Sequence, residues 1–478
     1  MNAQALLASL NPAQQEAARH IKGPLLILAG AGSGKTRTLT TRLAYLIGCV
    51  GIPPENTLTL TFANKAAREM RQRAMDLLGR QHTSYKPTLC TFHSFGHALL
   101  REHHALLDLP PDFQVVTQET MGAKLPEILG KPLEERTIKG MFKKFSQVKN
   151  QCVPLKSCWE SVQWAFVLYN AFLRQNGLVD FDDLIALPYA LLEKNLALAK
   201  SLGQRYAYIS VDEYQDTNPL QFKLLQKLCG THQNLCVVGD DDQSIYGFRG
   251  ADVRNILAFE HHFKGAKVIK LEQNYRSTQN ILECANQLIK HNRQRHNKTL
   301  FSDKAKAPSQ KLKFLHFANA DAENIFLVQQ IQDCLNRGIA PQNIAILYRL
   351  HCLAKKIHEG LKGAHILHEI LRPDDNPLEN YTPPPEGIRG VQCMSVHTSK
   401  GLEFSVVFLV GFEEDFFPYG GVEDIEEERR LCYVAITRAK EELYICSAKE
   451  RCYFDKIYTR LEPSSFLEEA QLHLQAES

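Results

Sequence analysis

A glycine-rich turn carries the first residues whose types and spacing suggest chemistry. The stretch AGAGSGKT, residues 29–36, follows the apolar run PLLIL and precedes a predicted helix. Backbone amides of such a turn can approach phosphate groups closely, and the start of a helix favours negative charge. Lys35 would then bind the β and γ phosphates, and Thr36 would ligate Mg2+. A chance glycine turn is the alternative, but strand, loop, Lys-Thr pair and helix follow in the order that phosphate binding requires. The predicted nucleotide-binding loop is Ala29, Gly30, Ala31, Gly32, Ser33, Gly34, Lys35 and Thr36.

A second group of chemical residues follows the apolar run YAYISV, which leads directly into Asp212 and Glu213. Asp212 suits the coordination shell of Mg2+, and Glu213 suits the orientation and deprotonation of an attacking water. An acidic pair after a strand is more often a solvated turn, but here it shares a chain with a phosphate-binding loop. The two motifs together predict hydrolysis of a nucleoside triphosphate with Mg2+ as cofactor.

The composition is that of an ordinary globular protein. Of 478 residues, 44% are hydrophobic and 23% are charged, which is unlike a disordered or fibrous chain. The net charge of +3 gives no bulk attraction to polyanions, so nucleic-acid binding would depend on local patches. The thirteen cysteines lack the CxxC spacing of zinc sites. No stretch reaches the ~18 apolar residues of a membrane span, and the first ten residues contain no basic segment. We therefore expect a cytoplasmic protein with no membrane partner.

Short apolar runs alternate with predicted helices along most of the chain. This alternation indicates parallel sheets covered by helices, and nine strands fit two α/β domains better than one. Between about Pro110 and Leu187 apolar positions recur at helical spacing, which predicts a helical insertion in the first domain. Prolines between about Leu361 and Gly390 predict a loop in the second domain. The nine runs are PLLILAG, TLTLTFA, YAYISVDE, NLCVVGD, KVIKLEQNY, NIAILYR, VQCMSV, SVVFLVG and ELYICSA.

Six motifs, in the same order, resemble those of superfamily 1 helicases of the UvrD/Rep/PcrA type. They are AGAGSGKT, VDEYQDTNPLQ, GDDDQSIYGFRGAD, QNYRST, VHTSKGLEF and EEERRLCYVAITRAK. Ala29 stands where the general phosphate-loop pattern has glycine, and alanine is usual there in that group. The resemblance implies an α/β fold of two RecA-like P-loop domains with parallel sheets. The implied division is 1–107 and 188–276 for the first RecA-like domain, 108–187 for its helical insertion, 277–362 and 390–478 for the second RecA-like domain, and 363–389 for a short loop.

The resemblance also implies residues that bind ATP. LNPAQ resembles an adenine-reading motif, so Gln14 would place its amide on the base and Tyr275 would stack on the face of the base. A stacked ring with a bidentate amide would favour adenine over guanine. Arg37 would lie near the base or the ribose, and Glu403 would be a further nucleotide contact.

Two arginines complete the implied catalytic set. Arg276 and Arg438 resemble the arginines that contact the γ phosphate, where such a residue contributes roughly 10³ to 10⁵ in rate. A structural salt bridge would be the commoner role for either one alone. Gln243 would sense the γ phosphate. The catalytic candidates are Lys35, Glu213, Gln243, Arg276 and Arg438.

Aromatic side chains predict how a nucleic-acid strand would be held. Stacking of bases on aromatic rings is worth ~1 to 3 kcal/mol per base and is independent of sequence. For a lone aromatic residue core packing is the commoner role, and this applies most to Phe62 and Phe181. By resemblance the DNA-binding candidates are Phe62, His93, Phe181, Tyr246, Phe248, Arg249, Arg349 and His397. The basic stretch from Lys290 to Lys313 would be either a solvated face or a set of phosphate contacts, with equal weight.

The sequence departs from the family pattern in one place. Fewer than fifty residues separate Arg349 from His397, so the second accessory subdomain of the family is expected to be missing or reduced to a loop. The whole pattern predicts an ATP-dependent 3′ to 5′ translocase on single-stranded DNA and a DNA helicase, with single-stranded DNA and single-strand/duplex junctions as partners. One alternative is an RNA-directed motor of the same superfamily, because stacking tolerates either sugar. The other is a nonmotor ATP-dependent DNA-binding scaffold.

Overall fold

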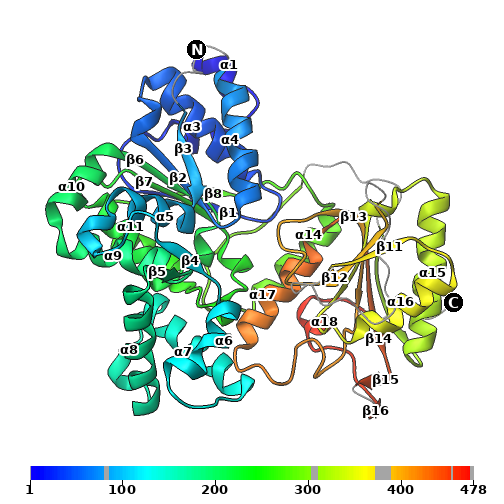
Figure 1. The fold of residues 1–478 in the computed structure, drawn as a ribbon. Coiled ribbons are helices and arrows are strands. Elements are labelled where there is room, and N and C mark those ends of the chain that lie inside the picture. Colours follow the sequence, from blue (N-terminus) through cyan, green and yellow to red (C-terminus); the bar gives the residue numbers. More distant parts are fainter. Residues whose placement is uncertain (1, 80–85, 303–310, 372–388, 454–455, 474–478) are drawn as a thin grey trace. The chain divides into compact units, whose positions relative to one another are not determined.

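The chain forms two compact units whose sequence segments interleave. The structure is a computed structural model that describes residues 2–79, 86–302, 311–371, 389–453 and 456–473. Unit 1 contains the residues up to Leu28 together with Lys35–Asp240 and Tyr246–Leu271. Unit 2 contains Ala29–Gly34, Asp241–Ile245 and the residues from Glu272 onward. Figure 1 shows one sheet flanked by helices in each unit.

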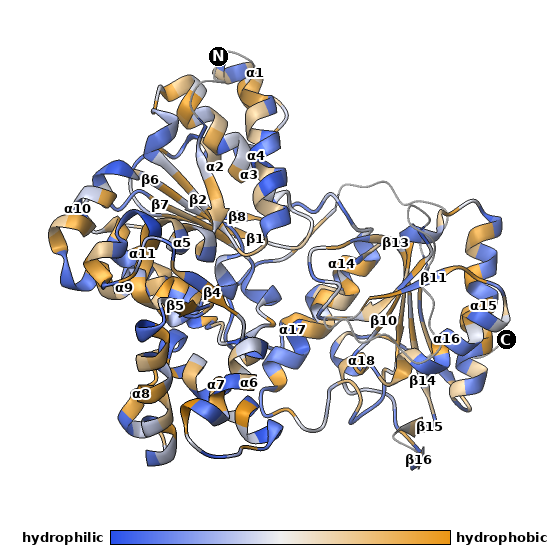
Figure 2. Cartoon of the chain, viewed as in Figure 1, coloured by the Kyte–Doolittle hydropathy of each residue, from blue (hydrophilic) through white to orange (hydrophobic). Residues whose placement is uncertain are grey.

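The sheet of unit 1 has six strands in the order β3-β2-β6-β7-β1-β8. The pairs β3–β2, β2–β6, β6–β7 and β7–β1 are all parallel. Strands β1, β2 and β7 are buried along their whole length, as expected for a sheet covered on both faces. Figure 2 shows the strands as apolar. The strands are β1 (Leu25–Ala29), β2 (Thr57–Thr61), β3 (Thr88–Thr91), β6 (Tyr208–Val211), β7 (Leu235–Gly239) and β8 (Lys267–Leu271).

Helices cover both faces of this sheet. Helices α3 and α4 lie on one face, and α9, α10 and α11 lie on the other (Figure 1). Leu26, Leu58, Ile209 and Val237, from four neighbouring strands, belong to one buried apolar core. The helices of unit 1 outside its helical insertion are α1 (Ala3–Leu7), α2 (Pro12–Arg19), α3 (Lys35–Tyr45), α4 (Asn64–Leu78), α5 (Phe92–Glu102), α9 (Asp183–Lys194), α10 (Leu196–Arg205), α11 (Pro219–Cys229), α12 (Arg254–Leu257) and α13 (Phe259–His262).

A helical insertion lies between α5 and α9, as predicted. It has its own apolar core, in which Phe145 stacks on Tyr169 with ring centroids 5.2 Å apart. A short parallel ladder of two strands joins its ends. The elements are β4 (Gln114–Val116), α6 (Gln118–Ile128), α7 (Glu135–Asn150), α8 (Glu160–Gln175) and β5 (Leu178–Asp180).

The sheet of unit 2 also has six strands, in the order β11-β12-β10-β13-β14-β9. All its neighbouring pairs are parallel. The expectation of a loop over residues 363–389 is wrong for the run HEIL, which pairs with β12 at the sheet edge; residues 372–388 lie outside the described part of the chain. The strands are β9 (Lys311–Phe317), β10 (Ile344–Tyr348), β11 (His368–Leu371), β12 (Val391–Ser395), β13 (Phe404–Val410) and β14 (Ala439–Ala448).

Helices cover the second sheet in the same manner. Helices α15 and α16 lie on one face, whereas α14, α17 and α18 lie on the other (Figure 1). A short antiparallel hairpin follows β14. The elements are α14 (Gln279–Ile289), α15 (Ala320–Asn336), α16 (Leu353–Gly363), α17 (Ile425–Ile436), β15 (Glu450–Tyr453), β16 (Lys456–Thr459) and α18 (Phe466–Glu469). Among the described residues, no helix has the length and apolar character that crossing a membrane would require.

Candidate functional site

The topology of the first sheet brings three candidate segments together at the carboxyl ends of neighbouring strands. Strand β7 lies between β1 and β6 and is parallel to both. The carboxyl ends of the three strands therefore lie together, which is where open α/β sheets bind ligands. The phosphate loop follows β1, Asp212 and Glu213 follow β6, and Asp240 follows β7.

The phosphate loop has the backbone that its glycines predict. Gly32 and Gly34 have φ angles of +64° and +81°, a region that residues with a Cβ rarely occupy. The Ser33 hydroxyl donates to the carbonyl oxygen of Gly30 at 2.8 Å and is buried. Helix α3 begins at Lys35, so the first turn of a helix follows the loop directly. These features fit a loop that surrounds a phosphate with backbone amides.

Residues of the QNYRST motif lie against the same loop within unit 2. Asn274 donates from Nδ2 to the carbonyl oxygen of Ala31 at 2.6 Å. The Asn274 Oδ1 accepts from the backbone amides of Arg276 and Ser277, each at 2.7 Å. A Cβ on Gly32 would lie 2.7 Å from the Cβ of Arg276, so the loop has no room for a side chain there. Asn274, which sequence reasoning missed, thus fixes Arg276 beside the phosphate loop.

The acidic pair lies next to Lys35. The Lys35 Nζ is 3.5 Å from Glu213 Oε2. Asp212 is buried, and burial followed by the charge of Glu213 raises the pKa of its carboxyl group, whereas Lys35 lowers it. Within the described ranges, Asp212 Oδ1 is a buried oxygen without a hydrogen-bond partner. A buried carboxylate oxygen of this kind fits a hard divalent cation such as Mg2+.

Glu213 has a strained backbone and a neighbour that holds its side chain. Its φ angle is +50°, in the left-handed region that is costly for residues with a Cβ and that clusters at functional sites. Gln215 Nε2 donates to Glu213 Oε2 at 2.6 Å, and Gln215 Oε1 accepts from the Asp240 amide at 3.0 Å. Gln215 is fully buried. Its amide therefore connects the ends of β6 and β7 and sets the position of the Glu213 carboxylate.

We expect Gln215→Ala to lower kcat for ATP hydrolysis by about 10- to 100-fold, because a misplaced catalytic group costs that much. The KM for ATP should stay within error of the parent, since Gln215 has no predicted contact with the nucleotide. Steady-state kinetics measure both. Gln221→Ala is the matched control, because Gln221 is also buried but caps α11. The control should lose about 1 kcal/mol of stability with kcat unchanged; equal loss of kcat in both variants would contradict the positioning role.

The aspartates of GDDDQ have partners that the sequence did not suggest. Lys298 Nζ contacts Asp241 at 2.7 Å and Asp242 at 2.6 Å, and Arg295 forms a bidentate ion pair with Asp242. All four side chains are nearly or completely buried. The sequence predicts either a solvated face or phosphate contacts for the stretch from Lys290 to Lys313. Both predictions are wrong for Arg295 and Lys298, because their side chains pair with buried aspartates. Residues 303–310 of the stretch lie outside the described residues.

Gln243 ends this anchored turn. It is buried in a short 3-10 turn, Asp241–Gln243, and its carbonyl oxygen accepts from Lys400 Nζ at 2.7 Å. Lys400 comes from the VHTSKGLEF motif. The structure therefore brings two of the sequence motifs into direct contact within unit 2.

In unit 2, Arg276 contacts Glu403 and Thr437, the residue that precedes Arg438. Arg276 Nε donates to Glu403 Oε2 at 2.7 Å, and Lys440 contacts the other oxygen of Glu403 at 2.8 Å. Burial alone would raise the pKa of Glu403, but Lys440 and Arg276 outweigh it and the pKa is lowered. Arg276 also donates to the Thr437 carbonyl oxygen at 3.3 Å.

Arg438 differs from Arg276 in its surroundings. It is 1% exposed and donates to the carbonyl oxygens of Val434 and Leu402 at 2.9 and 3.0 Å. Its guanidinium therefore also fastens the end of α17 to the residues before β13. A substitution of Arg438 would disturb packing as well as any role in hydrolysis, so Arg276 is the better probe of arginine chemistry.

One of the adenine-reading candidates, Gln14, also has a structural role at the start of a helix. Gln14 is the N3 residue of a capping box, in which its Oε1 accepts from the Asn11 amide at 3.1 Å. The chain contains a second N-P-x-Q sequence, Asn218–Gln221, and it forms the same capping box. The amide oxygen of Gln14 has a second lone pair, so the capping role and a contact with adenine are compatible. Arg37 is exposed on α3, and Tyr275 is half-exposed with its hydroxyl on Gln273.

Three strand-binding candidates form one exposed cluster in unit 1. Phe248 is 62% exposed, and its ring centroid lies 6.1 Å from that of Tyr246. The Arg249 guanidinium lies over both rings, at 5.3 and 5.4 Å from their centroids. Phe62 is partly exposed and its ring packs on that of Phe92 at 5.8 Å. Tyr246, Phe248 and Arg249 form a platform of the kind that stacks bases.

His93 and Phe181 form a second platform. Their rings stack with centroids 3.9 Å apart, and Phe181 is 55% exposed. Burial lowers the pKa of His93 to about 4, so the imidazole is neutral near pH 7 and offers a face rather than a charge. A buried network positions Phe181: Lys149 contacts Asp180 at 2.6 Å and Asp183 at 2.9 Å. Phe181 is therefore held at the surface and is not a core residue.

The two candidates in unit 2 are less accessible. Arg349 forms a bidentate ion pair with the buried Glu428, with contacts of 2.8 to 3.1 Å. Its guanidinium also lies 5.5 Å from the Tyr419 ring centroid. His397 follows β12 in the sequence, and its side chain is half-buried. Arg349 thus has the structural salt bridge that an isolated arginine most often makes.

The fold and the loop chemistry define a class of protein. A parallel sheet with a phosphate loop after one strand and an acidic pair after a neighbouring strand is the arrangement of P-loop nucleotide-binding proteins. The family model of the UvrD/REP helicase N-terminal domain matches residues 10–264. The model of the UvrD-like helicase C-terminal domain matches residues 269–374 and 380–450. The chain belongs to the UvrD/REP family of helicases, a class of ATP-dependent enzymes.

Curated relatives agree with this assignment. The chain is 30% identical to the "ATP-dependent DNA helicase PcrA" of Staphylococcus epidermidis strain ATCC 35984, over 639 aligned positions that cover 97% of this chain and 87% of the relative. It is also 30% identical to the protein of the same name from Staphylococcus aureus strain MRSA252, of which 86% is covered. Each alignment is longer than the 478 residues of this chain, so the relatives contain segments without a counterpart here.

Proposed function

We propose that the protein is an ATP-dependent motor on single-stranded DNA that translocates 3′ to 5′ and unwinds duplex DNA. The observation that supports this most directly is the contact of Lys35, in the phosphate loop, with Glu213 of the acidic pair at the end of β6. Phosphate binding and water activation require these groups side by side. Family membership adds the helicase activity, and the relatives' printed name adds ATP and DNA.

In this proposal each residue of the site has one task. Lys35 and the loop amides bind the phosphates of ATP, and Thr36 with Asp212 would hold Mg2+, which would neutralise charge on the phosphate oxygens. Glu213, held by Gln215, accepts a proton from the attacking water. Arg276, held beside the loop by Asn274, stabilises charge on the transferring phosphoryl group. Gln243, Arg438, Glu403, Gln14, Arg37 and Tyr275 are proposed as further nucleotide contacts.

The strand would be bound by the exposed rings of unit 1. The platform of Tyr246, Phe248 and Arg249 follows directly on the anchored turn that ends at Gln243, so only Ser244 and Ile245 separate the γ-phosphate sensor from the base platform. This short connection supports coupling between ATP hydrolysis and strand binding. His93, Phe181 and Phe62 are proposed as further stacking positions, and Arg349 and His397 as contacts from unit 2.

The second accessory subdomain is proposed to be missing. The C-terminal family match is interrupted between residues 374 and 380, within the proline-containing stretch. The alignments with the relatives exceed the length of this chain. An absent subdomain at this place would explain both observations.

We expect single-stranded DNA to raise the rate of ATP turnover, because the base platform and the γ-phosphate sensor share one short segment. A coupled assay of phosphate release with and without oligothymidylate measures this stimulation. Duplexes with a 3′ or a 5′ single-stranded tail then test polarity, and displacement should occur from the 3′ tail alone. An ATPase that does not respond to DNA would contradict the motor, and stimulation by RNA of the same sequence but not by DNA would favour the RNA-directed alternative.

A further inference from the structure

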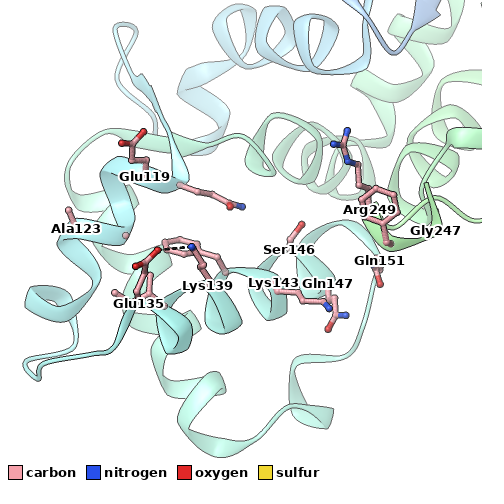
Figure 3. A pocket seen from close by; sticks show the side chains of 15 residues that line it. Glu119, Ala123, Glu135, Lys139, Lys143, Ser146, Gln147, Gln151, Gly247 and Arg249 are labelled. Carbon is pink, nitrogen blue, oxygen red and sulfur yellow. Dashed lines mark ion pairs between the residues drawn. The ribbon is translucent and has the colours of Figure 1, made fainter. Parts of the chain in front are cut away.

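The helical insertion of unit 1 contains a hollow that is lined by none of the residues of the candidate site. Its volume is about 700 Å³, and it lies against α7 and the start of α8. Figure 3 shows the other side of α7, where Lys143 and Gln147 line a different hollow. The buried part of the lining is apolar, because Met141 and Val162 belong to the core of the insertion. A hollow of this size can hold a few side chains of a ligand.

Trp159 lines this hollow and is 84% exposed. It is the N-cap residue of α8, but its side chain makes no capping hydrogen bond. A serine, threonine, aspartate or asparagine at an N-cap stabilises a helix by about 1 kcal/mol. Within the described part of the chain the Trp159 ring stacks on no other ring and has no cation over it, whereas Lys131 lies 5.6 Å from the Trp164 ring centroid. The large ring of Trp159 therefore contributes little to the stability of the insertion.

Three residues of α7 line the hollow at a spacing of four. They are Arg136, Gly140 and Lys144, so they share one side of the helix. A glycine inside a helix costs about 1 kcal/mol relative to alanine. A Cβ at Gly140 would meet no atom within 4 Å, so no neighbour among the described residues requires glycine there. The missing side chain leaves the backbone of α7 accessible between two cationic side chains.

The charge of the hollow has one sign. Arg136 and Lys144 are both exposed, and the described residues that line the hollow include no carboxylate. Neither cation forms an ion pair with another described residue, and Lys144 donates to Gln147 at 3.1 Å. A complementary ligand would therefore combine negative charges with an apolar group. Tryptophan and arginine are also the residues that most often dominate the energy of protein–protein binding.

We propose that this hollow binds an acidic peptide segment of a partner protein. An apolar side chain of the peptide packs on the Trp159 ring beside Gly140, and its carboxylates pair with Arg136 and Lys144. A nucleic-acid strand fits less well, because single strands stack successive bases on several rings, and Trp159 is the one aromatic residue among the described residues that line the hollow. This interaction surface goes beyond the proposed function and does not depend on it.

The test measures the binding of fluorescein-labelled synthetic peptides to the full chain by fluorescence anisotropy. The peptide EEEELFEEEE should bind, and QQQQLFQQQQ and EEEESSEEEE, which lack the charges or the apolar side chains, should bind more weakly. Trp159→Ala removes the apolar anchor and Gly140→Leu fills the space beside it, so each should weaken binding of EEEELFEEEE by about tenfold or more. Arg136→Gln and Lys144→Gln should each weaken it by about two- to fivefold, as expected for an exposed ion pair.

Lys143→Gln is the matched control. Lys143 is adjacent to Lys144 on α7 but lines the other hollow, so this variant should bind the peptide as the parent does. Trp164→Phe provides an independent measurement, because it leaves Trp159 as the only tryptophan of the chain. Addition of EEEELFEEEE should shift the emission of this variant to shorter wavelength as the indole loses contact with water.

The inference would be overturned if EEEELFEEEE did not bind, if the three peptides bound equally, or if Lys143→Gln and Lys144→Gln had equal effects. Displacement of the peptide by oligothymidylate would also overturn it, because the hollow would then be a nucleic-acid site. Trp159→Ala should retain the DNA-stimulated ATP turnover of the parent. A failed peptide test with normal turnover would thus reject the docking surface and leave the proposed function unaffected.

Discussion

Replacement of Glu213 by glutamine is expected to lower the rate of ATP hydrolysis by about 10²- to 10⁴-fold, the usual contribution of a positioned general base. Glutamine has the shape of glutamate and can still accept the hydrogen bond from Gln215 Nε2, but it cannot take a proton from water. The left-handed backbone at this position would be unchanged. Phosphate release at saturating ATP and single-stranded DNA measures the effect.

The binding of ATP should survive this change. Lys35 and the loop amides remain, so a fluorescent ATP analogue should bind with an affinity within a fewfold of that of the parent. Glu193→Gln is the control, since Glu193 pairs with Lys227 at 2.6 Å in the same unit but away from the strand ends. A Glu213→Gln protein with the turnover of the parent would refute the general-base role and would revive the nonmotor scaffold.

Replacement of Arg276 by alanine is expected to reduce kcat by about 10³-fold, because an arginine at the transferring phosphoryl group contributes that much. Arg276 is held beside the phosphate loop by Asn274 and is mostly buried against Glu403. Its loss should not unfold the protein, since a partly exposed ion pair contributes only about 0 to 1 kcal/mol. Single-turnover hydrolysis isolates the chemical step from product release.

Lys440→Gln is the matched control for Arg276. Lys440 contacts the other carboxylate oxygen of Glu403, so its removal leaves Glu403 with one cation, as the Arg276 variant does. If Arg276 acts on the nucleotide, the Lys440 variant should retain most of its turnover. Equal losses in the two variants would show that the charge balance of Glu403, and not an arginine at the phosphate, limits the reaction.

The sequence predicted every inner strand of the two sheets and one edge strand, β8. All nine apolar runs form strands in the two sheets, because a continuous Val/Ile/Leu run has few alternatives in a folded protein. The edge strands β3, β9 and β11 were missed. Strand β9 begins in the last residues of the basic stretch, which the sequence analysis interprets only by its charge, and β11 is a four-residue run within the proline-containing stretch that it predicts as a loop. Short or polar edge strands acquire their conformation from pairing with a neighbour, which a local pattern does not contain.

The sequence indicates the chemical residues of the candidate site but not the residues that support them. Lys35, Asp212 and Glu213 are recognisable because phosphate and metal chemistry restrict their types and spacing. Gln215 and Asn274 act through contacts with residues distant in the sequence, and no spacing rule reveals such contacts. The N-P-x-Q sequence at Gln14 has two meanings, because a pattern assigned to ligand recognition also closes a helix end; the adenine contact stays a prediction.

The interleaving of the two units makes this chain a poor candidate for dissection into fragments. A cut after Leu271 would follow the end of a strand and would appear natural in the sequence. The resulting piece would contain Asp241 and Asp242 but neither Arg295 nor Lys298. The two carboxylates would then lose both their ion pairs and the residues of unit 2 that bury them, so the turn that ends at Gln243 would lose its anchor. The halves of the sequence are therefore not modules that can be made separately and mixed, and the phosphate loop reaches its observed environment only in the intact chain.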